Sequence, residues 1–193
     1  MERICVFCGS SAGSSAIYAE KARELGRTLG RRKIGVVYGG GGVGLMRELA
    51  DGALAEGGEV IGVIPRALEL RELAHGGLTR LEVVSSMHER KARMAELAGG
   101  FVALPGGMGT LEEFAEVLTW AQLGLHAKPI ALLDVAGYYR PLVSFFDQAV
   151  AHGFVRPEHR ALVLVAEGAE AILEAFAAWH PPAIERWIDT RTA

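Results

Sequence analysis

The sequence predicts an α/β protein, in which a doubly wound parallel sheet is covered by helices on both faces. Two observations support this fold class. Short apolar runs alternate along the chain with segments of helical periodicity. The apolar runs contain few polar residues, as expected for parallel strands buried on both faces. No repeat or linker interrupts the alternation, so we expect a single domain over residues 1–180 and a tail over 181–193.

Composition limits the class of partner. The chain has 193 residues, 50% of them hydrophobic, which is enough for one sizeable core. Its net charge of −3 provides no overall attraction for nucleic acid or for an anionic membrane. No apolar run approaches the length of a bilayer crossing, and no signal-peptide pattern precedes the first strand. We expect a soluble cytoplasmic protein that binds neither nucleic acid nor membrane.

The two cysteines, Cys5 and Cys8, have the C-x-x-C spacing of some redox and metal sites. The sequence contains no second cysteine pair, and no histidine lies near this one. We therefore interpret both cysteines as small core residues and predict no metal site.

The first predicted strand, over 3–7, leads into a loop of small polar residues that includes Ser10. A loop after the first strand of a parallel sheet commonly faces the ligand, where its N–H and hydroxyl groups can bind phosphate or ribose. Ser14 or Ser15 can alternatively serve as the cap of the helix predicted over 17–31. The two interpretations are compatible, because different serines can fill the two roles.

A second glycine loop follows the strand predicted over 34–38. Gly39, Gly41 and Gly44 match the G-x-G-x-x-G pattern of dinucleotide-binding loops. The match follows the second strand rather than the first, and the next strand, over 59–64, ends without an acid placed for a ribose. We interpret the loop as part of a mononucleotide pocket.

Two cations mark the helix predicted over 86–98, which follows an irregular segment over 65–77 and a short strand over 81–84. Arg90 and Lys91 fall within the apolar stripe of this helix. A charge on an inward stripe is costly unless its long side chain reaches solvent or meets an anion. Both residues are therefore candidates for holding a ligand, with simple snorkelling as the alternative.

The central motif of the chain runs over 105–113, after the strand predicted over 101–104. A strand that turns through glycines directly into a helix aims uncovered N–H groups at an anion, most often a phosphate. The Thr110 hydroxyl can cap this helix or donate to a phosphate oxygen. Glu113, one turn inside, can act on whatever the phosphate carries. The alternative is a plain tight turn with acids that complement the helix dipole.

The glutamates of the helix that follows the motif are predicted to lie on different faces of that helix. Glu113 falls at the border between the apolar face and the cleft, whereas Glu112 and Glu116 are predicted to project away from the core. An exposed stripe with Trp120 and Leu123 suggests a surface for self-association. The remaining elements are strands over 129–134 and 161–165 and helices over 138–152 and 169–179.

Taken together, the motifs resemble the LONELY GUY family of cytokinin-activating enzymes. The resemblance is specific around Arg90 and Glu113 and runs in matching order from Cys8 to about Asp134. It is carried by Tyr38-Gly39-Gly40-Gly41, Gly44-Leu45-Met46, Ser86-Met87-His88-Glu89-Arg90-Lys91, the PGGxGTxxE motif over 105–113, and Thr119-Trp120-Ala121-Gln122-Leu123-Gly124.

The resemblance implies a Rossmann-like homodimer that hydrolyses the N-glycosidic bond of adenosine 5′-monophosphates, such as AMP or N6-prenyl-AMP, without a cofactor. Arg90 and Glu113 correspond by position to the catalytic pair of the family. The substrate-binding positions that the resemblance implies are Glu72, Lys91, Gly107, Met108, Gly109, Thr110, Leu111, Glu112 and Thr119. Met108 departs from the aromatic residue of many relatives, and Arg47 from a frequent glycine, which bears on specificity for the base.

Three other functions were compared with this one. Lysine decarboxylation, a label that many relatives carry, needs a Schiff-base lysine with an acidic partner for the cofactor ring. Only four lysines are present, and Lys91 lies beside an arginine. A nucleotidase needs metal-binding acids or a nucleophile beside the phosphate, and neither is evident. A regulatory protein that binds nucleotide without catalysis remains an alternative, although the catalytic pair is present.

Overall fold

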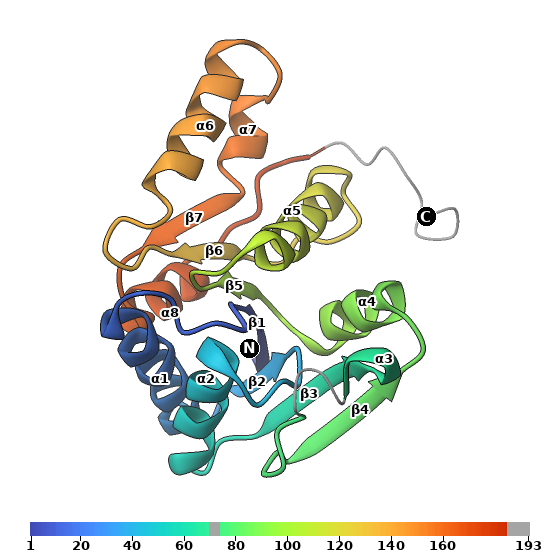
Figure 1. The fold of residues 1–193 in the computed structure, drawn as a ribbon. Coiled ribbons are helices and arrows are strands. Elements are labelled where there is room, and N and C mark those ends of the chain that lie inside the picture. Colours follow the sequence, from blue (N-terminus) through green and yellow to red (C-terminus); the bar gives the residue numbers. More distant parts are fainter. Residues whose placement is uncertain (70–73, 185–193) are drawn as a thin grey trace.

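Seven strands form one parallel sheet in the order β4-β3-β2-β1-β5-β6-β7 (Figure 1). The computed structural model describes residues 1–69 and 74–184. The strands are β1 (Arg3–Phe7), β2 (Gly35–Tyr38), β3 (Val60–Pro65), β4 (Arg80–Val84), β5 (Phe101–Ala103), β6 (Ile130–Leu133) and β7 (Val163–Ala166). The strand order reverses between β1 and β5. The loops after these two strands therefore diverge and leave a crevice at the carboxyl edge of the sheet.

Helices cover both faces of the sheet, which confirms the predicted fold class. They are α1 (Ala16–Arg31), α2 (Gly44–Ala55), α3 (Arg66–Glu69), α4 (Met87–Leu97), α5 (Met108–Gln122), α6 (Arg140–Ala151), α7 (Pro157–Arg160) and α8 (Ala169–Ala177). One face packs against α1, α2 and α8, and the other against α4 and α5. None of the described helices is long and apolar enough to span a bilayer.

The strands show why their sequences are continuously apolar. Within β1, Ile4 and Val6 pack beneath α1 and α2, whereas Cys5 and Phe7 pack toward α4 and α5. Alternate side chains of one strand thus enter two separate cores, and both must be apolar. The free Cys5 lies fully buried in one of these cores, as the sequence analysis predicts for a small core residue.

Two short helices, α3 and α7, are not predicted from the sequence. Each has four residues, which is too few to show a helical period. The segment over 65–77, predicted as irregular, contains α3 and an isolated bridge between Gly41 and Ala74. The bridge connects this segment to the loop after β2. Helical periodicity therefore identifies long helices and misses single turns.

Two strongly exposed aromatic side chains lie at the β7 edge of the molecule. There α6 and α7 project beyond the sheet in Figure 1. Phe145 is 61% exposed and Phe154, in the loop between the two helices, is 87% exposed. Trp120 is predicted to lie on an exposed stripe. It is instead half-buried, because it packs against the core between the sheet and α5.

Candidate active site

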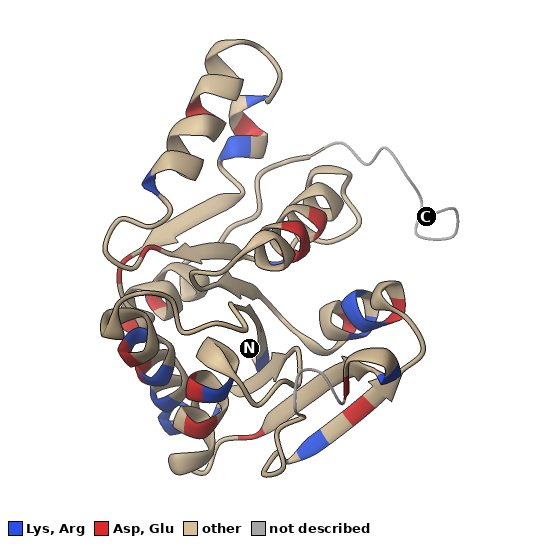
Figure 2. Cartoon of the chain, in the orientation of Figure 1, with Lys and Arg blue, Asp and Glu red and all other residues tan. Residues whose placement is uncertain are grey.

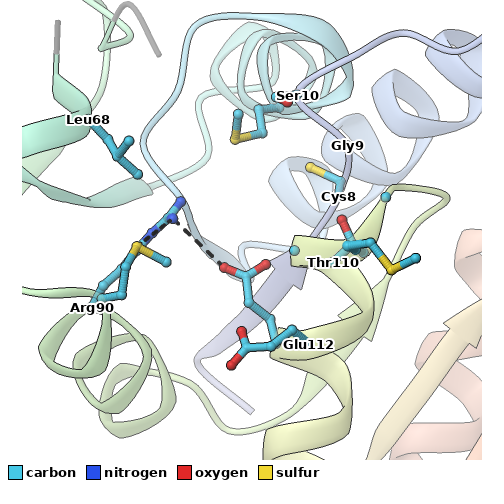
Figure 3. Close-up of a pocket in the computed structure, with 13 residues that line it drawn as sticks. Cys8, Gly9, Ser10, Leu68, Arg90, Thr110 and Glu112 are labelled. Carbon is cyan, nitrogen blue, oxygen red and sulfur yellow. Dashed lines mark hydrogen bonds and ion pairs between the residues drawn. The ribbon is translucent and has the colours of Figure 1, made fainter. Parts of the chain in front are cut away.

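A cavity of about 350 Å³ opens at the carboxyl edge of the sheet, at the switch point (Figure 3). Its walls are formed by the loop after β1, by α3, by the first turns of α2 and of α4, and by the start of α5. The residues that line it are Cys8, Gly9, Ser10, Met46, Leu68, Met87, Arg90, Gly107, Met108, Gly109, Thr110, Glu112 and Glu113. Two motifs that lie far apart in the sequence, around Arg90 and Glu113, therefore meet in one pocket.

The amino terminus of α5 forms one wall. Gly107 is its N-cap residue, with an extended backbone and no side chain that caps the first turn. Gly107, Met108 and Gly109 are exposed, whereas Thr110 is buried. The first N–H groups of a helix have no partner within the helix, and here glycine leaves them accessible from the pocket. This arrangement can hold a phosphate or another anion.

The two glycine loops reach the same place by close packing. Gly44 begins α2 with a φ of +54°, and a Cβ atom at this position would lie 2.3 Å from the Ser10 carbonyl oxygen. Only glycine permits this approach with this backbone conformation. The second glycine loop thus supports the Ser10 loop, as expected if both loops contribute to one pocket.

Arg90 is the buried cation of the site, with only 7% of its side chain exposed. Its Nε donates to the Val63 carbonyl oxygen at 3.1 Å, and its Nη2 donates to the Gly39 carbonyl oxygen at 3.0 Å. Val63 lies within β3 and Gly39 directly follows β2, so the guanidinium is held by the backbone at this edge of the sheet. A guanidinium stays charged at any working pH and is less strongly hydrated than an ammonium, which suits a buried position.

Glu113 faces Arg90 from the first turns of α5. Its Oε1 lies 4.0 Å from the Arg90 Nη1, and 11% of its side chain is exposed (Figure 3). Burial raises the pKa of the nearby Cys8 thiol, and the charge of Glu113 raises it further. Cys8 is therefore a neutral thiol in the pocket wall and not a thiolate nucleophile.

Lys91 lies behind the pocket wall. Its Nζ donates to Glu116 Oε1 at 3.0 Å and also contacts Glu112 Oε1, and 8% of its side chain is exposed. Figure 2 shows the acidic segment of α5 to which these two glutamates belong. Burial by itself would lower the pKa of Lys91, but the hydrogen bonds to the two carboxylates outweigh it and raise that pKa. The prediction that Glu116 projects away from the core is wrong. One of its oxygens bonds Lys91, and the other is buried.

The remaining predicted site residues fall in different places. Leu111 is half-buried and packs against the core, and Thr119 is exposed, with its hydroxyl bonded to the Ala115 carbonyl oxygen of its own helix. Neither lines the pocket. Glu72 lies outside the described residues. Ser10, Arg90, Glu113 and the positions from Gly107 to Thr110, with Glu112, are brought together.

Sequence reasoning did not assign Met46, Leu68 and Met87 to the site. They form an apolar side of the pocket opposite the start of α5. The position of Met87 could have been predicted from the sequence, because Met87 lies three residues before Arg90 and therefore on the same face of the helix. The position of Leu68 could not, since Leu68 belongs to the short α3.

The sheet, the two glycine loops and the buried arginine–glutamate pair define a Rossmann-like protein with its pocket at the switch point. Solved structures share this fold. The molybdenum cofactor carrier protein of Chlamydomonas reinhardtii has a TM-score of 0.70 and 26% identity, over 92% of this chain and 98% of that chain. The molybdenum cofactor binding protein of Rippkaea orientalis has a TM-score of 0.69 and 21% identity, over 91% and 95%.

Comparison with characterised sequences identifies the family. A probable cytokinin riboside 5′-monophosphate phosphoribohydrolase of Oryza sativa subsp. japonica is 51% identical, over 93% of this chain and 79% of that protein. The enzyme of Rhodococcoides fascians is 50% identical, over 89% and 87%. This chain belongs to the family of cytokinin riboside 5′-monophosphate phosphoribohydrolases, the LONELY GUY family. A family model described as "possible lysine decarboxylase" also matches residues 46–176.

Proposed function

We propose that this protein hydrolyses the N-glycosidic bond of adenosine 5′-monophosphates, including N6-modified ones, to the free base and ribose 5-phosphate. The observation that carries the proposal is the buried Arg90–Glu113 pair beside an uncapped helix N-terminus, in a family of phosphoribohydrolases. The anion-binding end of α5 and the charged pair lie in one pocket, close enough for a nucleotide to reach both.

The chemistry follows from charge. When the bond between C1′ and the base nitrogen breaks, positive charge develops on the sugar, as in glycoside hydrolysis. A carboxylate close to C1′ stabilises that charge and can orient or deprotonate the attacking water, and we assign this role to Glu113. One water is consumed: its hydroxyl group adds to C1′, and its proton balances the departing base.

Arg90 and the glycine loop position the substrate in this proposal. Arg90, anchored on the Val63 and Gly39 carbonyl groups, would hold the Glu113 carboxylate and the substrate in register. The first turn of α5, from Gly107 to Thr110, would bind the 5′-phosphate together with the Ser10 loop. Binding energy from the phosphate then places the sugar for reaction at a distant bond.

The apolar side of the pocket bears on the base. Met46, Leu68 and Met87 line it, and Met108 at the rim is 84% exposed. Methionine side chains adapt to the shape of an apolar ligand. This supports acceptance of an N6-alkyl substituent in addition to adenine itself.

The lysine chemistry implied by the name of the family model is not supported. A Schiff-base lysine must lose its proton to attack a carbonyl group. Lys91 instead contacts two carboxylates that raise its pKa, and it lies outside the pocket wall. The protein is a phosphoribohydrolase and not a lysine decarboxylase.

We also propose that the protein is a cytoplasmic homodimer. In each copy, residues 1–180 would form the catalytic domain and residues 181–193 a tail. The exposed Phe145 and Phe154 support self-association, because a second copy of the chain could cover these apolar side chains. The free, buried Cys5 and Cys8 fit a reducing compartment.

The test is chromatography of AMP and N6-isopentenyladenosine monophosphate after incubation with the wild type, Glu113→Ala and Glu174→Ala, without added metal. We expect free base and ribose 5-phosphate from the wild type, and at least about a hundredfold less from Glu113→Ala. Glu174→Ala is the matched control, since Glu174 is exposed on α8 across the sheet. Nucleoside plus phosphate would instead indicate a nucleotidase, and binding without turnover a regulatory protein.

A further inference from the structure

A second cavity, of about 360 Å³, adjoins the proposed nucleotide pocket. The two cavities share residues of the loops after β1 and β5, Gly107 among them. Tyr138, from the loop between β6 and α6, lines the second cavity and not the first. Its ring packs edge-on against Tyr18, and its hydroxyl donates to the Gly106 carbonyl oxygen at 2.6 Å. A tyrosine outside the pocket thus holds the backbone immediately before α5.

The turn from β5 into α5 is held at its carbonyl groups. The four carbonyl oxygens from Leu104 to Gly107 all accept hydrogen bonds. Their donors, in chain order, are the Tyr139 hydroxyl, the Gly9 N–H, the Tyr138 hydroxyl and the Leu111 N–H. The described peptide bonds are trans, so the C=O and N–H of one plane point in opposite directions. A donor that fixes a carbonyl oxygen therefore also fixes the direction of the next N–H.

The plane between Gly106 and Gly107 bears on anion binding. Gly107 is the N-cap residue of α5, and its N–H has no partner within the helix. A peptide plane between two glycines has more rotational freedom than one between other residues. The Tyr138 hydroxyl removes that freedom, because it holds the oxygen of this plane on the side of the second cavity. The Gly107 N–H then points away from Tyr138.

We propose that Tyr138 is a positioning residue for the phosphate, which turns the Gly106–Gly107 peptide so that the Gly107 N–H donates to a phosphate oxygen of the nucleotide. This inference rests on the proposed function, in which the start of α5 binds the 5′-phosphate. The hydroxyl proton of Tyr138 is already donated to Gly106, so the tyrosine acts through the backbone. Its effect is confined to ligands that carry a phosphate.

The first measurement is the dissociation constants of AMP and adenosine, by titration calorimetry, for Glu113→Gln and for Glu113→Gln combined with Tyr138→Phe. The Glu113→Gln background suppresses turnover, and phenylalanine keeps the ring while it removes the hydroxyl. AMP should bind about 5- to 30-fold more weakly, because the N–H loses its direction but is not deleted. Adenosine should stay within about twofold. Unchanged AMP affinity, or an equal loss with adenosine, overturns the proposal.

The matched control is Tyr139→Phe in the same background. The Tyr139 hydroxyl also donates to a backbone carbonyl at 2.6 Å, that of Leu104, but the next residue is Pro105, which has no N–H to direct. We expect lower resistance to urea, because a buried carbonyl loses its partner, and AMP affinity within about twofold. Equal weakening of AMP binding in both variants would reduce Tyr138 to general support of the loop. If Tyr139→Phe fails to fold, the comparison of AMP with adenosine still decides.

The second measurement separates positioning from direct contact. Gly107→Pro removes the N–H in question, and a Cβ atom at this position meets nothing within 4 Å. Once Gly107→Pro is present, Tyr138→Phe should change the AMP dissociation constant by less than about twofold. A hydroxyl that touches the phosphate itself would keep its full effect, which overturns the proposal.

Nuclear magnetic resonance answers the same question if Gly107→Pro fails to fold by circular dichroism. The Gly107 amide proton should move downfield when AMP binds to Glu113→Gln, and it should move less when Tyr138→Phe is added. An equal movement in both proteins contradicts the proposal. A wild type that releases no base overturns the proposed function instead, because the binding comparisons are made without turnover.

Discussion

At the scale of single residues, Gly39 affects the site through its contact with Arg90, although it does not itself line the pocket. Its carbonyl oxygen accepts a hydrogen bond from Arg90, and a Cβ atom at this position would lie 2.0 Å from Arg90 Nη2. The atom that must move is the end of a long side chain, which can shift while the backbone keeps its place. A side chain at position 39 would therefore displace the guanidinium of Arg90, which lies fifty-one residues further along the chain.

We predict that Gly39→Ala displaces the guanidinium and lowers kcat/KM for AMP by about 10- to 100-fold while the fold is kept. The activity assay and circular dichroism together check this. Gly76→Ala serves as the control, because a Cβ atom there meets nothing within 4 Å. Full activity in Gly39→Ala would show that the contact between Arg90 and Gly39 is not needed.

At the scale of elements, the start of α5 differs from the start of α4, the other helix that carries a member of the charged pair. The first N–H groups of α5 are uncapped, and Thr110 is the buried hydroxyl beside them. By contrast, Ser86 caps α4 by accepting from the Glu89 N–H, and Glu89 accepts from the Ser85 N–H in return. The difference leaves α5, and not α4, ready for an anion.

We predict that Thr110→Val lowers kcat/KM for AMP by about 10- to 150-fold, since a hydrogen bond to a charged group contributes about 1.5–3 kcal/mol. Adenosine, which lacks the phosphate, serves as the control substrate. It should react more slowly with the wild type and be unaffected by the substitution. An equal loss with both substrates would place the role of Thr110 elsewhere.

The loop between α5 and β6 carries a pH-sensitive contact. His126 accepts from the Lys128 N–H through Nδ1, so its Nε2 bears the proton that is donated to the Val117 carbonyl oxygen at 2.9 Å. Burial lowers the pKa of His126, and the charge of Lys128 lowers it further. The folded protein thus favours the neutral imidazole.

We predict that this contact loses stability in acid. A histidine whose pKa is lowered by folding contributes its full stability above its unfolded pKa of about 6.5, and loses it as the pH falls through the lower, folded value. Unfolding by urea between pH 7.5 and 5 should therefore show a smaller loss of stability in His126→Gln than in the wild type. The exposed His152, replaced by Gln, is the control and should follow the wild type.

At the scale of the whole molecule, the two ends of the sheet differ. The β4 edge carries charged pairs such as Arg80 with Glu82, whereas α6 beyond the β7 edge has no buried residue and displays Phe145. Charged side chains protect a sheet edge from pairing, while an apolar helix face favours association. A second copy of the chain at α6 would cover this surface.

We predict that Phe145→Asp combined with Phe154→Asp converts the proposed dimer to a monomer, as measured by sedimentation equilibrium. Val83→Asp is the control, because Val83 is an exposed hydrophobic residue that lies on β4 at the opposite edge of the sheet. A wild type that sediments as a monomer, or a double variant that stays dimeric, would contradict the proposed interface.

Much of the fold is predictable from local sequence because each strand enters two cores. Ile4 and Cys5 must both be apolar to fill opposite faces of β1, so the strand is visible as an apolar run. The long helices are visible for the same reason, through one apolar face each. The short α3 and α7 were missed because four residues bury too little surface to impose a pattern.

The sequence by itself determined the fold class, the glycine motif and the residues Arg90 and Glu113, because each depends on neighbours within a few positions. Only the tertiary structure decided what these residues touch. Arg90 binds the carbonyl groups of Gly39 and Val63, and Lys91 bonds Glu112 and Glu116. Periodicity locates a side chain on one face of its own helix, but a buried charge takes its partner from whichever element packs opposite.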